Sequence, residues 1–228
     1  DFGLNLPPAA NCGIRLGSVV QHGRVLSFPP VVLRQEELAK HVFITGVTGS
    51  GKTTTCMNML LASGLPFMVI EPAKTEYRAL HARASDIEYY TLGREDLTPF
   101  RLNPFELVSR RSSLSSHIDV LKNTLNAVYP MEAAMPYIVE EAIIQAYRRK
   151  GWDIHSGSNY LVDDPFAPHS GAWPNFADMI AELDAIITSK EMGEEFRQKY
   201  RGSLVARLSN LTQGTKGRML NCRASLDF

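Results

Sequence analysis

The residues between Gly46 and Thr53 have the types and the spacing of a phosphate-binding turn. They read Gly-Val-Thr-Gly-Ser-Gly-Lys-Thr and fit the pattern G-x-x-x-x-G-K-[ST] at every fixed position. A phosphate chain requires backbone N–H groups that point inward from a tight loop, and glycines permit the dihedral angles and the close approach. The stretch therefore predicts a nucleotide site, and a guanine-reading N-K-x-D motif is missing from the sequence.

Each part of this loop has an expected role. We expect Lys52 to reach the β- and γ-phosphates of ATP and the hydroxyl of Thr53 to bind Mg²⁺. The loop opens a helix whose N-terminus carries partial positive charge and free N–H groups. The expected nucleotide-binding residues are Gly46, Val47, Thr48, Gly49, Ser50, Gly51, Lys52, Thr53 and Thr54.

The flanks of the loop predict the elements that position it. Residues 42–44, Val-Phe-Ile, read as a short buried strand. Beyond the loop, apolar residues at helical spacing predict an amphipathic helix that stops at Gly64. These residues are Cys56, Met57, Leu60 and Leu61. Strand, loop and helix together are the context that the motif requires.

A second apolar strand, residues 67–70, ends at Glu71, and residues 89–93 read as a third. A strand–helix–strand order at this spacing implies a right-handed parallel unit, with ligands beyond the carboxyl ends of the strands. Glu71 would then lie near the phosphates, where a carboxylate can orient water. The alternative for Glu71 is a solvated carboxylate at the end of a strand.

The rest of the chain predicts a hairpin and a set of helices. The hairpin turns at Gln21-His22-Gly23 and ends at Pro29-Pro30. Helical spacing predicts helices over 115–129, from Pro136 to just before Gly151, after a cap at Asn175, and over 194–212 with a break at 202–203. The predicted organisation is a linker and hairpin (1–30), a nucleotide-binding core (31–107), a helical subdomain (108–213) and the start of a returning strand (214–228).

Composition sets the broad class. The chain has 228 residues, 44% hydrophobic and 21% charged, as in a soluble globular protein, and its 24 basic and 24 acidic residues balance. Overall charge thus gives no support for a nucleic-acid surface, although a pore can be locally basic. The sequence has three dispersed cysteines, no signal peptide and no apolar run of about 20 residues. These features predict a cytoplasmic chain with no membrane segment. Because the chain starts at Asp1, we expect a piece of a longer protein.

Hydrolysis of a nucleotide also needs an acidic pair after an apolar strand, one acid near Mg²⁺ and one to orient water. Asp163 and Asp164 follow a short apolar run, but Pro165 comes next and the surroundings are loop-like. We interpret these two acids as turn residues. The six histidines form no metal-ligand spacing.

Three stretches together resemble the HerA branch of the HerA/FtsK ATPases: residues 41–46, 48–55 and 70–78. In that branch the strand after the phosphate-loop helix typically ends in an acid-proline-x-x-x-Glu-Tyr pattern. Glu71-Pro72 and Glu76-Tyr77 match it. The resemblance is specific around these residues and looser over the remainder of 14–220.

The resemblance implies an α/β, RecA-like P-loop NTPase core with a helical insertion, preceded by a β-hairpin that ends a small β-barrel. It implies hexameric rings that bind ATP between subunits and move double-stranded DNA, with a nuclease or another effector protein as partner. Lys52 and Glu71 would be catalytic. The family's second acidic strand, Walker B, and its arginine finger have no match here, so we expect this piece alone to be deficient in hydrolysis.

Other classes stay open. One is a conjugation-type ATPase that moves DNA or protein. Another is a P-loop small-molecule kinase, which would need an acceptor pocket and a short lid, whereas residues 108–213 read as a helical subdomain. The last is a nucleotide-binding module that does not hydrolyse its ligand.

Overall fold

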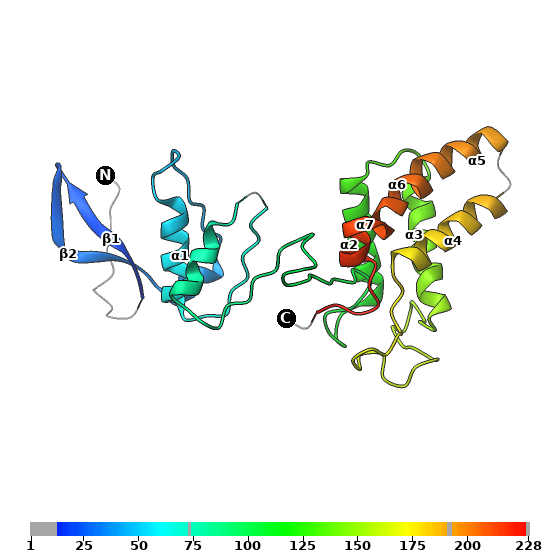
Figure 1. Ribbon diagram of the computed structural model, residues 1–228, viewed down its shortest axis with the longest axis horizontal. Helices are drawn as coiled ribbons and strands as arrows, with labels where there is room; N and C mark the ends of the chain where they lie inside the picture. Colours follow the sequence, from blue (N-terminus) through cyan, green and yellow to red (C-terminus); the bar gives the residue numbers. More distant parts are fainter. Residues whose placement is uncertain (1–12, 73, 191–192, 227–228) are drawn as a thin grey trace. The chain divides into compact units, whose positions relative to one another are not determined.

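The chain divides into two compact units, one up to Tyr89 and one from Tyr90 onward. The structure, a computed structural model, describes residues 13–72, 74–190 and 193–226 (Figure 1). The predicted linker at 1–12 lies outside the described residues. Residues 90–107 therefore belong to the second unit, whereas the sequence predicts a boundary at 107/108.

The predicted hairpin at the start of the first unit is confirmed. Strand β1 (Ile14–Gln21) pairs antiparallel with β2 (Arg24–Leu33). The turn residues His22 and Gly23 have φ of 50° and 74°, the positive values that a two-residue hairpin turn requires. The prolines do not end the hairpin as predicted, since Pro30 pairs with Ser18 inside β2. A two-stranded ribbon has only edge strands, where a missing N–H is tolerated.

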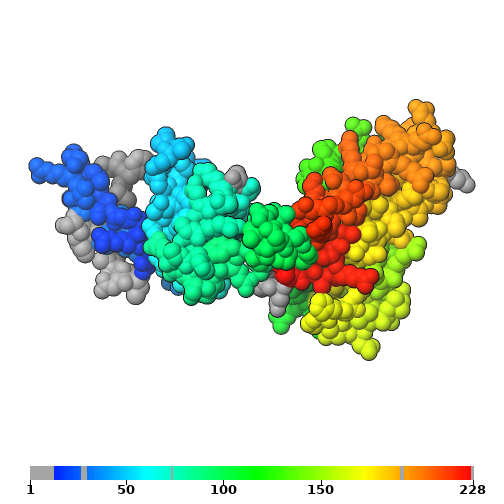
Figure 2. Space-filling view, viewed as in Figure 1, coloured from blue at the N-terminus to red at the C-terminus, as the bar shows by residue number. Residues whose placement is uncertain are grey.

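The helix after the phosphate loop is also confirmed. Helix α1 (Lys52–Ser63) ends at Gly64, whose φ of 64° gives the left-handed cap that glycine adopts at little cost. The predicted apolar face of α1 is half-buried. Two short 3₁₀ helices complete the unit, η1 (Gln35–Ala39) and η2 (Glu76–Ala82). Helix α1, η2 and the loop between them form one continuous surface, coloured cyan to teal (Figure 2).

The predicted parallel strands at 42–44, 67–70 and 89–93 are wrong. Over the described residues the strands are β1 and β2 alone, apart from one isolated bridge between Trp152 and Asn159. The side chains of Phe43 and Ile70 are 90% and 84% exposed. A parallel ladder is stable when partner strands flank it and helices cover both of its faces. In the described part of the first unit a single α-helix, α1, is present to cover these segments.

The second unit is helical, as predicted for residues 108–213. Helices α2 (Leu114–Val128), α3 (Met135–Arg149) and α4 (Phe176–Ser189) form its centre, and α3 and α4 lie side by side (Figure 1). The chain continues through α5 (Glu194–Tyr200), a π-helical turn η3 (Arg201–Val205), α6 (Ala206–Ser209) and a 3₁₀ turn η4 (Asn210–Thr212). Among the helices of the described residues, none is both long and apolar enough to cross a membrane.

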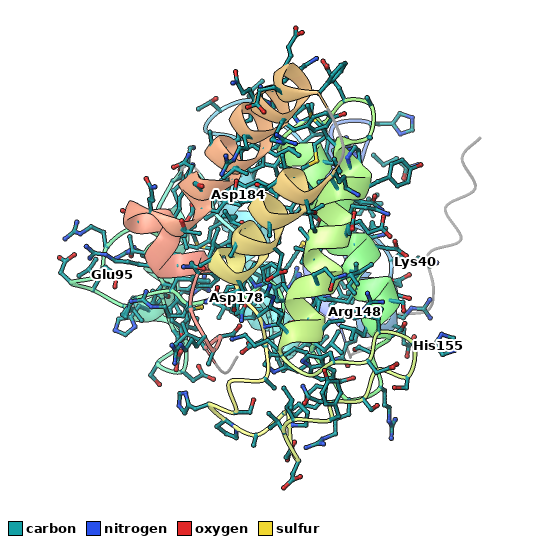
Figure 3. The ribbon with its side chains drawn as sticks, turned by 90° about the vertical axis from the view of Figure 1, so that its right-hand side faces the viewer. Lys40, Glu95, Arg148, His155, Asp178 and Asp184 are labelled. Atoms are coloured by element: carbon teal, nitrogen blue, oxygen red, sulfur yellow. The ribbon has the colours of Figure 1, made fainter. Side chains whose placement is uncertain are left out.

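The start of α4 lies where the sequence predicts it. The predicted cap Asn175 accepts a hydrogen bond from the N–H of Asp178, whose carboxylate accepts one from the N–H of Asn175. Farther along α4, Asp184 pairs with Arg201 at 2.6 Å; Asp178 and Asp184 are labelled in Figure 3. Arg201 begins the π-helical turn, so the break predicted at 202–203 is a change of helix type within a continuous helical path.

The predicted returning strand at 214–228 is wrong over its described part. Residues Gly214–Leu220 form helix α7. Residue 217 must be glycine here, because a Cβ atom would lie 2.3 Å from the carbonyl oxygen of Thr212. The segment after α7 runs along residues 101–106, where the N–H of Leu226 donates to the oxygen of Arg101 at 2.9 Å. Helix α7 and a segment hydrogen-bonded to Arg101 thus stand where the sequence predicts a strand.

Buried polar groups tie the loops of the second unit to its helices. Asn103 is 1% exposed, donates to the oxygen of Pro174 at 2.9 Å and accepts from the N–H of Phe105. The hydroxyl of Tyr147 donates to the oxygen of Phe105 at 2.5 Å, and burial raises the pKa of this hydroxyl strongly. Trp152 is buried as well and donates to the oxygen of Ala172. Each bond satisfies a carbonyl that water cannot reach.

The variant Tyr147→Phe should therefore destabilise the second unit. It leaves the oxygen of Phe105 buried without a donor, which costs about 1–3 kcal/mol, or roughly 2–4 °C of Tm for each kcal/mol. Both tryptophans, Trp152 and Trp173, lie in this unit, so their fluorescence reports its unfolding. The control is Tyr160→Phe, which removes an exposed hydroxyl 3.4 Å from the oxygen of Arg148. Equal Tm values for the two variants would contradict the assignment.

Candidate nucleotide-binding site

The backbone of the phosphate loop explains where its glycines stand. Gly49 and Gly51 have φ of 80° and 86°, in the left-handed region that other L-residues enter only with strain. The N–H of Ser50 donates to the oxygen of Val47 at 3.2 Å, which closes the turn. A Cβ atom on Gly46 would lie 2.6 Å from the hydroxyl oxygen of Ser50. Positive φ at Gly49 and Gly51 and the close approach of Gly46 to Ser50 therefore account for the glycines of the loop.

Lys52 turns its side chain back over this loop. Its Nζ donates to the oxygens of Gly46 and Val47 at 2.8 and 2.9 Å. Helix α1 begins directly at Lys52, with no acid in its first turn and no side-chain bond from its cap residue, Gly51. The first N–H groups of such a helix are donors for an anion. Phosphate oxygens can thus replace the two carbonyls as acceptors for Lys52, and this donor set fits a polyphosphate.

Helix η2 packs against α1. The guanidinium of Arg83, directly after η2, donates to Asn58 of α1 at 2.9 Å. Leu80 of η2 is buried. These contacts anchor η2 beside the helix that follows the phosphate loop.

Neighbouring groups shift the pKa values of Glu76 and Tyr77. The hydrogen bond from Thr53 is the main cause that holds the pKa of Glu76 below its usual value, and Lys74 and Lys52 lower it further. Lys74 forms an ion pair with Glu76 at 3.0 Å. Burial, with the bond to Cys56, raises the pKa of Tyr77 to about 12. At neutral pH Glu76 is therefore an anion and Tyr77 is a neutral phenol.

Glu71 forms hydrogen bonds to the backbone of η2. Its two carboxylate oxygens accept from the N–H groups of Glu76 at 3.0 Å and Tyr77 at 3.4 Å. Glu71 thus caps the first turn of η2, and it is half-buried rather than fully solvated. A role in orienting water stays a prediction. The observed contacts show Glu71 fixing the backbone that carries Glu76.

Sequence reasoning did not assign Glu76 a site role. The signal was present in the acid-proline-x-x-x-Glu-Tyr pattern, in which the second acid, Glu76, follows Glu71 by five residues.

The acidic pair Asp163 and Asp164 lies in the second unit. Asp164 accepts a hydrogen bond from the N–H of Phe166 and pairs with Arg110 at 2.6 Å. That geometry confirms the turn interpretation of Asp164. Across the described residues no group of three or more His, Cys, Asp or Glu side chains could hold a metal ion.

The loop, the lysine and the helix that starts directly at it have the arrangement that the predicted phosphate-binding motif requires. Comparison with solved structures agrees. The structure of VirB4 of Thermoanaerobacter pseudethanolicus is similar, with a TM-score of 0.62 and 20% sequence identity. The match covers 93% of this chain and 53% of that one, so the chain spans about half the length of VirB4. No protein-family model and no curated protein matches the sequence.

A likeness at 20% identity shows a shared fold. Because it extends over nearly the whole chain, it includes the helical unit as well as the phosphate loop. The fold is therefore of the kind found in VirB4, and this is compatible with the predicted P-loop NTPase fold. The finer HerA assignment rests on the motifs alone.

The variant Gly51→Ala tests the loop geometry. An alanine at φ of 86° is strained by about 1–2 kcal/mol, and relief of that strain would turn N–H groups away from the phosphates. We expect binding of a fluorescent ATP analogue to weaken at least ~10-fold, the equivalent of 1.4 kcal/mol. The control is Gly202→Ala, a position outside the positive-φ region with open space around its Cβ. Unchanged affinity for Gly51→Ala would contradict the loop assignment.

Proposed function

We propose that this chain is the ATP-binding core of a P-loop ATPase. The observation that carries the proposal is the loop from Gly46 to Thr53, whose lysine and helix start are arranged for a polyphosphate. ATP is the expected nucleotide and Mg²⁺ the expected metal. Magnesium, when bound, neutralises phosphate charge and bridges phosphate oxygens.

The residues of the chain would act in sequence. Lys52 would exchange the oxygens of Gly46 and Val47 for phosphate oxygens. The N–H groups at the start of α1 would donate to the phosphates, and Thr53 would contribute its hydroxyl to the metal. These groups would bind the nucleotide and neutralise the charge of its phosphates. Phosphoryl transfer further requires a positioned water and a positive charge supplied from outside the loop.

A conjugation-type ATPase that moves DNA or protein is the function we favour. The support is the likeness to VirB4, which extends over 93% of the chain and therefore over both of its units. In this proposal the ATPase assembles as an oligomer, and each subunit's nucleotide receives an arginine from its neighbour. Residues beyond this chain would complete the site.

A HerA-type translocase of double-stranded DNA is the second candidate. One specific observation favours it, the match of Glu71-Pro72 and Glu76-Tyr77 to the pattern of that branch. In this proposal a hexamer encloses the duplex and works with a nuclease or another effector protein. The two candidates share the same nucleotide site and differ in what they move.

Nucleotide binding is the first test. Saturating ATP with Mg²⁺ should raise the Tm of the chain, because a ligand present at 100 times its Kd stabilises the folded state by about 2.7 kcal/mol. Lys52→Ala should abolish the shift. Lys216→Ala, which removes an exposed lysine in the other unit, should keep it. The proposal is wrong if the wild type and Lys52→Ala melt identically with ATP, measured by calorimetry.

Hydrolysis is the second test. This chain alone should bind ATP and release phosphate very slowly, whereas a longer product of its reading frame should be stimulated by duplex DNA. A neighbour's arginine is worth ~10³-fold or more in rate. Stimulation through DNA phosphates should fall steeply between low and high salt. Rapid turnover by this chain without DNA would contradict the proposed division of the site. Stimulation by a protein instead of DNA would favour the conjugation-type ATPase and exclude the HerA-type translocase.

A further inference from the structure

The last part of the second unit carries an unbalanced positive charge. Residues 197–226 contain seven arginines and lysines and no aspartate or glutamate, although basic and acidic residues balance over the whole sequence. They lie in α5, η3, α6, η4, α7 and the segment after α7, and we call them the basic ridge. Figure 2 shows the ridge, orange to red, as one continuous band on the visible face of this unit. A basic stripe along a helical path is typical of a surface that binds a polyanion.

Much of this charge has no acidic partner within the unit. Arg197 pairs with Glu194, and Arg201 pairs with Asp184. The side chains of four other basic residues are exposed and form no ion pair with any described residue: Lys199, Arg207, Lys216 and Arg223. Like charges on one surface repel each other, so an anionic partner would stabilise the ridge.

Arg207 lines a hollow of about 590 Å³ between the end of α2 and the turn η4. No acid among the described residues lines it, and four of its side chains carry N–H or O–H donors: Tyr129, Arg207, Asn210 and Gln213. Within the described part of the chain, these four side chains form no hydrogen bond, so their donors are open to a ligand. Side chains of these types are the usual donors to phosphate oxygens in protein–DNA contacts. The hollow therefore fits a phosphate group.

A second hollow, of about 670 Å³, lies between α4 and the π-helical turn η3. Ala206 lines both hollows and is exposed, so the two adjoin with only a methyl group between them. The second hollow is lined in part by Thr212 and Arg201, and Arg201 compensates the charge of Asp184 beside it. π-helical turns occur frequently at functional sites. The ridge thus has room for an extended ligand on both sides of α6.

The composition of the ridge selects among polyanions. Residues 201–226 contain no phenylalanine, tyrosine or tryptophan, so they offer no platform on which the bases of a single strand could stack. A DNA duplex presents one negative charge for about every 1.7 Å of its axis and can be bound through phosphates alone. We propose that the basic ridge binds the phosphate backbone of duplex DNA, with a phosphate in the hollow beside Arg207. The inference rests on the proposed function for the choice of DNA as cargo.

The test measures binding of a short fluorescein-labelled DNA duplex to the chain by fluorescence anisotropy, without nucleotide, over a range of salt concentrations. Loss of one phosphate contact lowers the affinity about 8-fold at about 0.1 M salt and makes the dependence of log K on log salt shallower by about 0.9. Arg207→Gln and Lys216→Gln should each show this loss, and they should show it equally on two duplexes of unrelated sequence.

The matched control is Arg148→Gln. Arg148 is an exposed arginine in the last turn of α3, and Figure 3 shows α4 between it and α7. Its substitution removes the same charge from the same unit, away from the ridge, and should leave the affinity for DNA at the wild-type value. Tryptophan fluorescence should give all three variants the Tm of the wild type, since each replaces an exposed side chain.

Competition identifies the partner. Unlabelled duplex should displace the labelled DNA more effectively than single-stranded oligo-dT or polyglutamate of equal total charge. Stronger displacement by oligo-dT would overturn the assignment to a duplex, and stronger displacement by polyglutamate would show that the ridge binds an acidic protein.

The remaining outcomes separate the inference from the function on which it rests. Equal affinities for Arg207→Gln, Lys216→Gln and Arg148→Gln, or no DNA binding by the wild type at low salt, would show that the inference is wrong. Neither result touches the nucleotide site, which the shift of Tm with ATP tests separately. If ATP gives no shift while the two ridge variants lose DNA as expected, the proposed ATPase function fails and the DNA-binding surface remains.

Discussion

The proposed nucleotide site depends on one backbone constraint, the left-handed conformation of Gly49 and Gly51. These two positions turn the chain so that α1 starts immediately at Lys52, with its first N–H groups at the loop. The same turn brings the carbonyls of Gly46 and Val47 within hydrogen-bonding distance of Lys52, and in the proposed function phosphate oxygens would replace them. A side chain at either glycine would strain this turn. The positions of Thr53 and of η2 beside it follow from where α1 begins.

The two units are stabilised by different means. The helical unit has a continuous apolar core, and its long loops are held by buried hydrogen bonds from Asn103, Tyr147 and Trp152 to backbone oxygens. The unit that carries the loop has few buried side chains among its described residues, and a hydrogen bond from Arg83 to Asn58 connects the end of η2 to α1. Such contacts contribute less than a core does, so the nucleotide is expected to order the first unit more than the second.

The sequence predicted correctly those elements that depend on local residue patterns. The phosphate loop, α1 and its stop at Gly64, the cap at Asn175 and the turn at Asp164 follow from residue types over a few positions, and the structure agrees. The strands at 42–44 and 67–70 were predicted from short apolar runs, but such a run forms a strand only when partners pair with it, which local sequence does not reveal. Gly217 shows the same limit, because its close approach to the carbonyl oxygen of Thr212 cannot be read from local sequence. The position of Glu76 depends on how η2 packs against α1, and residue spacing in the sequence does not predict that packing.

The central claim is that a magnesium nucleotide binds to the first unit, between the loop after Gly46 and the start of η2. Amide hydrogen exchange measured by mass spectrometry, with and without ATP and Mg²⁺, tests it most directly, because it reports where binding protects the backbone. The account predicts slower exchange in peptides that cover residues 46–55 and 74–80, and unchanged exchange in α2, α3 and α4. Protection confined to the helical unit, or none at all at saturating ATP, would contradict it.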